Sequence, residues 1–126
     1  MRLGIITGNL RRAAHVKLSH FGLAKYFYAD AEPVGGFGDF EPHRDDVARS
    51  ALKELSELVG GPPKDRLWVI GDTASDVQCG KAIKAQVLAV ETGSFNRDQL
   101  QPHGPDLILS DLTHASDWLD SLTGSV

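Results

Sequence analysis

A run of four apolar residues leads directly into a glycine and an acid, and this stretch limits the possible folds more than any other. Residues 67–70 read Leu-Trp-Val-Ile, and residues 71–76 read Gly-Asp-Thr-Ala-Ser-Asp. An unbroken apolar run of this length is typical of a parallel strand covered on both faces. Gly71 allows the backbone to turn sharply at the strand end. We therefore expect Asp72 at the tip of a strand and Asp76 in the first turn of the next helix.

Short apolar segments alternate with helical patterns along the rest of the chain. The glycine-rich stretch 34–39 is predicted to be a loop. Asn9 is the expected N-cap of the first helix and Gly22 its stop. We expect strands over residues 3–7, 26–29, 86–90 and 107–109, and helices over 10–21, 47–58, 76–85 and 113–122. This alternation predicts an α/β fold, a three-layer Rossmann-like parallel sheet.

Length and charge limit the classes of function. The chain has 126 residues, which suits one domain over 1–126. Its 13 basic and 17 acidic residues give a net charge of −4, which argues against nucleic-acid and anionic-membrane partners. Cys79 is the single cysteine, so an internal disulfide and a multi-cysteine metal site are excluded, and we expect a cytoplasmic protein. A small ligand remains the expected partner.

Asp72 and Asp76 are the strongest candidates for chemistry, because ligands of open parallel sheets bind beyond the carboxyl ends of the strands. Two acids this close repel one another unless a cation lies beside them. Mg²⁺, which prefers oxygen ligands and keeps several waters, suits such a pair. The alternative is that Asp76 only caps a helix and Asp72 only forms a turn.

Two further groups are candidate phosphate ligands. Thr7, Gly8 and Asn9 follow the first strand, where a hydroxyl, a backbone N–H and a helix start would form an anion cradle. Alternatively, Thr7 only ends the strand and Asn9 only caps the helix. Arg44 lies where the glycine-rich stretch meets the next helix, and its guanidinium would hold a phosphate or pair with a neighbouring surface acid.

Three segments, in this order, resemble motifs II, III and IV of the haloacid-dehalogenase-like (HAD) hydrolases, especially the phosphoglycolate-phosphatase-like members. They are residues 5–9 (Ile-Ile-Thr-Gly-Asn), the basic residue Arg44 before a helix, and residues 69–77 (Val-Ile-Gly-Asp-Thr-Ala-Ser-Asp-Val). The resemblance extends over residues 3–122. The fourth motif is specific, whereas the second and third gain weight from their order and spacing.

The resemblance implies a role for each matching residue. Thr7, with the Gly8 backbone and Asn9, would bind the transferred phosphoryl group. Arg44, at a position where most members have lysine, would neutralise the phosphate and the attacking carboxylate. Asp72 would be a direct Mg²⁺ ligand. Asp76 would orient that metal through water or neighbouring contacts.

The resemblance also implies a missing part. The family begins with a strand that ends in an Asp-x-Asp motif, whose first aspartate attacks phosphorus, and only two residues precede Leu3. We therefore expect the C-terminal portion of a HAD-like core, incomplete at its N-terminal central strand and without a cap domain.

The predicted function is Mg²⁺-dependent hydrolysis of phosphate monoesters, with a small phosphorylated substrate turned over only when the missing segment is supplied. The alternative is a non-catalytic domain that binds phosphate and metal or serves in assembly, with a homodimer covering the exposed sheet edges. A metal-free dehalogenase is disfavoured by the pair Gly71 and Asp72.

Overall fold

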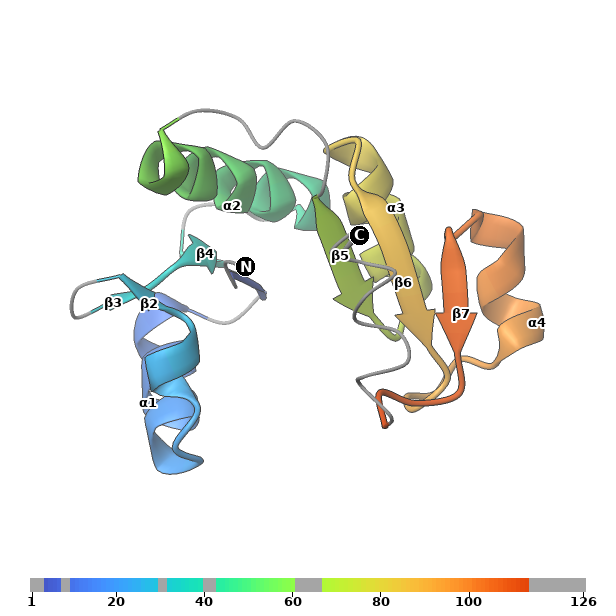
Figure 1. Cartoon of the computed structure of the whole chain (residues 1–126), viewed down its shortest axis with the longest axis horizontal. Coiled ribbons are helices and arrows are strands. Elements are labelled where there is room, and N and C mark those ends of the chain that lie inside the picture. The colour runs from blue at the N-terminus through green and yellow to red at the C-terminus, as the bar shows by residue number, and fades with distance from the viewer. Residues whose placement is uncertain (1–3, 8–9, 30–31, 40–42, 61–66, 114–126) are drawn as a thin grey trace, which may run out of the picture. The chain divides into compact units, whose positions relative to one another are not determined.

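The computed structural model describes residues 4–7, 10–29, 32–39, 43–60 and 67–113 (Figure 1). They belong to two compact units, Met1–Pro63 and Lys64–Val126, which are described one after the other. The single domain over 1–126 stays a prediction.

The first unit contains two pairs of short strands. β1 (Ile5–Ile6) pairs in parallel with β4 (Gly35–Gly36), with Ile5 opposite Gly35 and Ile6 opposite Gly36. β2 (Tyr28–Ala29) pairs antiparallel with β3 (Glu32–Pro33).

The prediction that residues 34–39 form a loop was wrong, because β4 lies in this stretch and is buried. The reason is steric. A Cβ at Gly35 would collide with the backbone of Ile5, and one at Gly36 with the carbonyl group of Val47. Two glycines therefore let β1 and the following helix approach this strand as closely as backbone allows.

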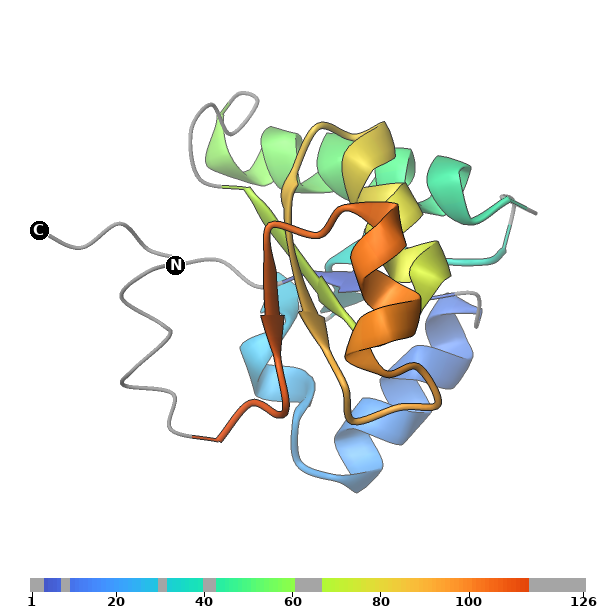
Figure 2. The same ribbon diagram turned by 90° about the vertical axis from the view of Figure 1, so that its right-hand side faces the viewer.

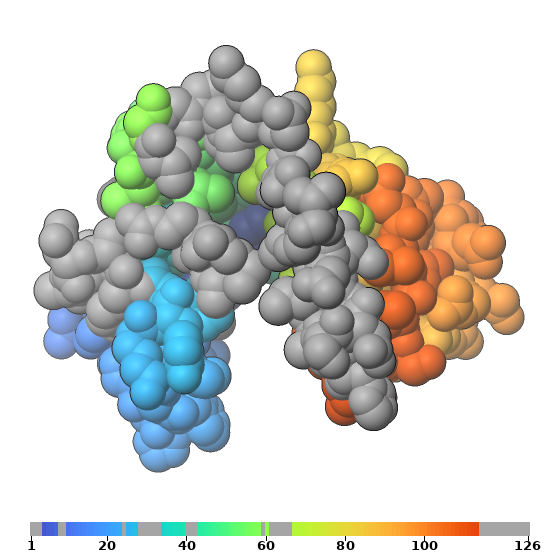
Figure 3. Space-filling view, viewed as in Figure 1, coloured from blue at the N-terminus to red at the C-terminus, as the bar shows by residue number. Residues whose placement is uncertain are grey.

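The helix α1 (Arg11–His20) ends where the sequence predicts. Gly22 has φ +70°, its N–H donates to the Ser19 carbonyl, and the Leu23 N–H donates to the Leu18 carbonyl, which is a Schellman motif. A 3₁₀ turn, η1 (Ala24–Tyr26), follows and contacts α1. In Figure 3 the darker blue atoms belong to α1, and the lighter blue atoms beside them belong to the segment that follows it.

The start of α1 differs from the prediction. The N-cap is Leu10, which has no side chain able to cap, and Asn9 lies outside the described residues. Ala14 is the one residue of α1 that is buried. Leu10 is 55% exposed and Phe21 is 72% exposed.

The longest helix, α2 (Arg44–Val59), packs on β4 and β1. It buries Val47 and Ala48 and ends at Gly60, whose φ of +81° lies in the left-handed region. The predicted helix over 47–58 is confirmed, although α2 begins three residues earlier, at Arg44.

The second unit is a parallel sheet with helices on it. β5 (Trp68–Gly71), β6 (Gln86–Val90) and β7 (Leu107–Leu109) lie in the order β5-β6-β7. α3 (Ala74–Ala82) packs on β5 and β6, and α4 (Arg97–Leu100) lies beside it, followed by the 3₁₀ turn η2 (Gln101–His103) (Figure 2).

The core of this unit lies around β6, whose residues 87–90 are all buried. Val77 of α3 and Leu100 of α4 complete it, and Phe95 and Ile108 pack against it. The predicted strands over 86–90 and 107–109 match β6 and β7, and the predicted α/β parallel fold is confirmed.

β5 differs from the strand that the apolar run predicts. Val69 is buried, but Ile70 is 45% exposed, so the expected cover on both faces is absent at Ile70. In the described sheet, β5 is an end strand that pairs on one side only. The predicted helix over 113–122 falls almost entirely outside the described residues. Among the described helices, none has the length and apolar character to cross a membrane.

Candidate functional site

The turn after β5 is held by the carboxylate of Asp76. Its Oδ2 accepts hydrogen bonds from the backbone N–H groups of Asp72, at 2.9 Å, and Thr73, at 3.1 Å. The Thr73 hydroxyl oxygen accepts in return from the Asp76 N–H at 3.1 Å. Asp76 is 8% exposed, so these bonds are largely shielded from water. The backbone that carries Asp72 is therefore fixed by the second acid of the motif.

This geometry changes the predicted start of the helix. α3 begins at Ala74, two residues before the expected Asp76, because Thr73 supplies the N-cap and Asp76 occupies position N3 of a capping box. The interpretation of Asp76 as an N-cap was wrong, although its contribution to the helix start is real. The structure brings Asp72 and Asp76 together through the turn backbone.

Two glycines make room for these carboxylates. A Cβ at Gly71 would collide with the carboxylate of Asp76. A Cβ at Gly93 would collide with the carboxylate of Asp72, lying 2.8 Å from its Cγ. The Asp72 side chain, half-buried, thus lies against the loop that follows β6. Sequence reasoning missed Gly93; the available signal was the Thr-Gly-Ser run of residues 92–94, one residue after the end of a buried strand.

Thr7 follows β1 in the first unit and is half-buried. Its N–H donates to the carbonyl of Gly36 at 3.2 Å, which extends the β1–β4 pairing by one residue. Gly8 and Asn9, the other members of the predicted anion cradle, lie outside the described residues.

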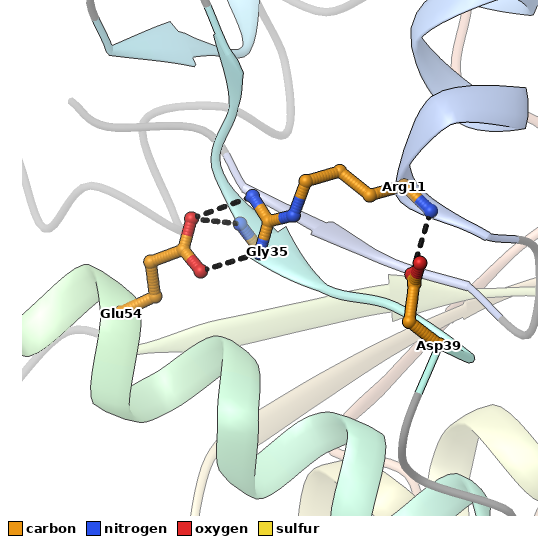
Figure 4. Close-up of polar contacts among 4 residues, drawn as sticks. All are labelled: Arg11, Gly35, Asp39 and Glu54. Atoms are coloured by element: carbon orange, nitrogen blue, oxygen red, sulfur yellow. Dashed lines mark hydrogen bonds and ion pairs between the residues drawn. The ribbon is translucent and has the colours of Figure 1, made fainter.

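The N-terminus of α1 already contacts a carboxylate from a distant part of the chain. Asp39 Oδ1 accepts a hydrogen bond from the Arg11 N–H at 2.8 Å (Figure 4). This carboxylate at the positive end of the helix replaces the local cap that Leu10 cannot give.

The Arg11 side chain is occupied as well. Figure 4 shows its guanidinium turned toward Glu54 of α2, whose Oε1 also accepts from the Gly35 N–H at 3.4 Å. The guanidinium stacks over the Phe37 ring, 4.4 Å from its centroid. The charge of Arg11 therefore joins secondary-structure elements of the first unit.

Arg44 is the first residue of α2 and is half-buried, with its Nε atom inside the protein. Of the acids that sequence reasoning offered as surface partners, Asp46 instead pairs with Arg49 at 2.8 Å. Arg44 lies at the start of α2, as predicted. Thr7 and Arg44 belong to the unit Met1–Pro63, whereas Asp72 and Asp76 belong to the unit Lys64–Val126.

Asp72 is the group best suited to a metal. Residues 4–7, 10–29, 32–39, 43–60 and 67–113 contain no cluster of three or more histidine, cysteine or acidic side chains that would form a complete protein cage. A single oxygen donor at a strand tip still fits Mg²⁺, which is often held by one or two carboxylates and retains several waters. Cys79 is buried, with its thiol directed at the Asp76 carbonyl at 3.3 Å, and takes no part in such a donor set.

Known proteins resemble this chain at the level of family and fold. A crystal structure of a predicted phosphatase from Clostridium acetobutylicum is similar with a TM-score of 0.79 and 24% identity, over 97% of this chain and 53% of that chain. The chain thus spans about half the length of that structure, and the likeness concerns the fold. No curated protein matches the chain. The profile of the HAD-hydrolase-like family matches residues 43–115, which include Arg44, Asp72 and Asp76. The match extends over more than half of the 126 residues, and the chain therefore belongs to the HAD-hydrolase-like family.

Proposed function

We propose that this chain carries the metal-binding and phosphate-binding parts of a Mg²⁺-dependent phosphatase of the phosphoglycolate-phosphatase-like type, acting on phosphate monoesters. The observation that carries the proposal is the turn after β5, where buried Asp76 fixes the backbone of Asp72. Membership of a hydrolase family and the likeness to a predicted phosphatase support the same chemistry.

In this proposal Asp72 is the direct metal ligand and Asp76 acts through the turn. The Asp76 Oδ2 atom already accepts two backbone N–H groups, so its role is to hold Asp72 at the strand tip. A bound Mg²⁺ would supply charge neutralisation for the phosphoryl group.

Thr7, Gly8, Asn9 and Arg44 are proposed as the phosphate ligands. A threonine hydroxyl and backbone N–H groups donate to phosphoryl oxygens, and an arginine adds a permanent positive charge with two parallel donors. The position of Arg44 at the first turn of α2 supports this role, because the helix start adds positive potential there.

The 126-residue chain has no Asp-x-Asp motif ahead of Thr7. We propose that it binds metal and phosphate but does not turn over a phosphate ester unless a segment with that motif is supplied. Aspartate attack divides a slow hydrolysis into two easier steps, whereas Thr7, Arg44 and a metal ion held by Asp72 would only bind and polarise the phosphate. The second candidate is a non-catalytic phosphate- and metal-binding domain, with a homodimer as its assembly.

The experiment is a Mn²⁺ titration followed by water-proton relaxation, with Mn²⁺ as the probe for the Mg²⁺ site. The wild-type chain is compared with Asp72→Asn and with the matched control Asp98→Asn, which neutralises an exposed acid in the first turn of α4. We expect Asp72→Asn to abolish the specific binding and Asp98→Asn to retain it. Equal binding by wild type and Asp72→Asn would refute the metal assignment.

To separate the two candidate functions, a peptide containing a hydrophobic strand that ends in Asp-x-Asp is added in trans or fused ahead of Met1. Turnover of p-nitrophenyl phosphate that requires this segment, Mg²⁺ and Asp72 supports the phosphatase. Metal and phosphate binding without turnover in the fusion supports the non-catalytic domain.

A further inference from the structure

The backbone of the loop after β6 touches the Asp72 carboxylate at Gly93. This loop, residues 91–96, is called here the Gly93 loop. A Cβ added at Gly93 would overlap the carboxylate group of Asp72, reaching its Cβ, Cγ and Oδ2 atoms. Among the described glycines, those with positive φ do not include Gly93, so its backbone conformation is open to any residue. The glycine is required here for space and not for conformation.

The Gly93 loop is held at its base and has little freedom to retreat. The Glu91 N–H donates to the Leu109 carbonyl at 3.0 Å, and its carboxylate accepts from the Arg97 N–H at 2.6 Å. The Arg97 guanidinium in turn donates to the Ile108 carbonyl at 3.1 Å. Both ends of the loop are therefore tied to one another and to the edge of β7.

The far end of the Gly93 loop is fixed by packing and capping. Phe95 packs against the buried cluster around β6. Asn96 and Gln99 form a second capping box, with bonds of 3.0 Å and 2.9 Å between each side chain and the other residue's N–H. A steric conflict at Gly93 is thus relieved more easily by moving the Asp72 side chain than by moving the loop.

We infer that Gly93 is a positioning residue that sets the rotamer of Asp72. The Gly93 loop, which is fixed at both ends, lies on one side of the carboxylate and restricts its movement. The inference rests on the proposed function, in which Asp72 is the metal ligand. The loop restricts the side-chain rotamers of Asp72 and therefore the orientation of its carboxylate oxygens, which favours one geometry for a bound cation.

The test compares Gly93→Ala with Ser94→Ala, a small change at the adjacent, exposed position of the same loop. The first readout is the carboxyl ¹³C resonance of Asp72 in metal-free protein, assigned with Asp72→Asn. The second is the Mn²⁺ affinity. We expect Gly93→Ala to displace the Asp72 resonance and to weaken Mn²⁺ binding by about tenfold or more, as disturbed ligand-orienting contacts do, and Ser94→Ala to change neither.

An unmoved Asp72 resonance and an unchanged Mn²⁺ affinity in folded Gly93→Ala would overturn the inference. Failure of the proposed function is distinct: Mn²⁺ then binds no variant specifically, while the metal-free resonance still reports on Gly93. If Gly93→Ala does not fold, Glu91→Gln serves instead, because it weakens the contact between the Glu91 carboxylate and the Arg97 N–H that holds the loop, and leaves Gly93 in place. Glu91→Gln is expected to lower the Mn²⁺ affinity, and an unchanged affinity would count against the inference.

Discussion

Arg11 and Glu54 join α1 to α2 through two parallel hydrogen bonds, 3.1 Å from Nη1 to Oε1 and 2.8 Å from Nη2 to Oε2. Both side chains are about one-third exposed, at 33% and 31%. The fork of a guanidinium matches a carboxylate in this geometry and is stronger than a single contact between point charges. Glu54 also accepts a hydrogen bond from the Gly35 N–H, so this one carboxylate of α2 contacts both α1 and β4.

A double-mutant cycle with Arg11→Met and Glu54→Gln should give a coupling free energy of roughly 1 kcal/mol, because the pair is bidentate and partly shielded. The free energy of unfolding in urea gives this value. The control cycle uses Arg49 and Asp46, whose side chains are 56% and 42% exposed, and should give about 0.3 kcal/mol. Equal coupling in the two cycles would contradict the structural importance of the Arg11–Glu54 pair.

Gly36→Ala should lower the free energy of unfolding by about 3 kcal/mol, because its Cβ would lie within the Val47 carbonyl group of α2, and neither backbone can yield cheaply. Gly60→Ala is the control. Its Cβ meets nothing within 4 Å, so only the left-handed φ of +81° costs energy, about 1 kcal/mol. Urea unfolding measures both, and a smaller loss for Gly36→Ala than for Gly60→Ala would disprove the close approach.

Asp76→Ala should cost about 2 kcal/mol of folding free energy, since it leaves the N–H groups of Asp72 and Thr73 without their acceptor. Asp76→Asn keeps an acceptor oxygen and should cost less. In the Mn²⁺ titration, Asp76→Asn should weaken binding while Asp72→Asn abolishes it. Loss of binding to the same extent in both variants would instead indicate that Asp76 is a direct ligand.

Arg44→Gln should weaken binding of inorganic phosphate roughly tenfold, the effect of losing one charge-assisted contact, whereas Arg44→Lys, which keeps the charge but loses the parallel donors, should weaken it less. Line broadening of the phosphate ³¹P resonance measures the binding. Arg49→Gln, on the same helix and paired with Asp46, is the matched control and should have no effect. If Arg44→Gln and Arg49→Gln behave alike, Arg44 is not a phosphate ligand.

The chain alone should not hydrolyse p-nitrophenyl phosphate in the presence of Mg²⁺. A threonine hydroxyl needs a general base to attack phosphorus, and water attack needs an acid or base that the Asp-x-Asp motif normally provides. Asp72→Asn controls for contaminating phosphatase. Turnover that disappears in this variant would show that the chain carries its own nucleophile.

Sequence patterns predicted the three strands and α3 of the second unit because their signals are local, whereas the one-turn helix α4 was missed. The apolar runs of β6 and β7 and the acids of the Asp72 turn each depend on neighbours a few residues away. The predicted start of α3 was two residues too late, because Thr73 and not Asp76 is the N-cap. Both residue types cap helices, so the sequence alone does not decide between them.

The first unit was harder to predict because its decisive contacts join distant segments. The glycines of β4 resemble a loop in sequence, and only the approach of Ile5 and Val47 explains why they form a strand. Likewise, neither Glu54 nor Asp39 carries a sequence signal for its contact with Arg11, since 43 and 28 residues separate the partners. The roles of Thr7 and Arg44 stay predictions.

The cap that Asp39 gives to α1 also bears on the order in which the first unit folds. A ten-residue helix without a local N-cap is too short to persist in water by itself. Its capping carboxylate arrives only after the chain between Arg11 and Asp39, which are 28 positions apart, has closed into a loop, which brings an entropic cost before the bond forms. α1 is therefore expected to be a late-forming helix that follows the docking of β4, and a peptide of residues 10–23 alone should be largely unstructured.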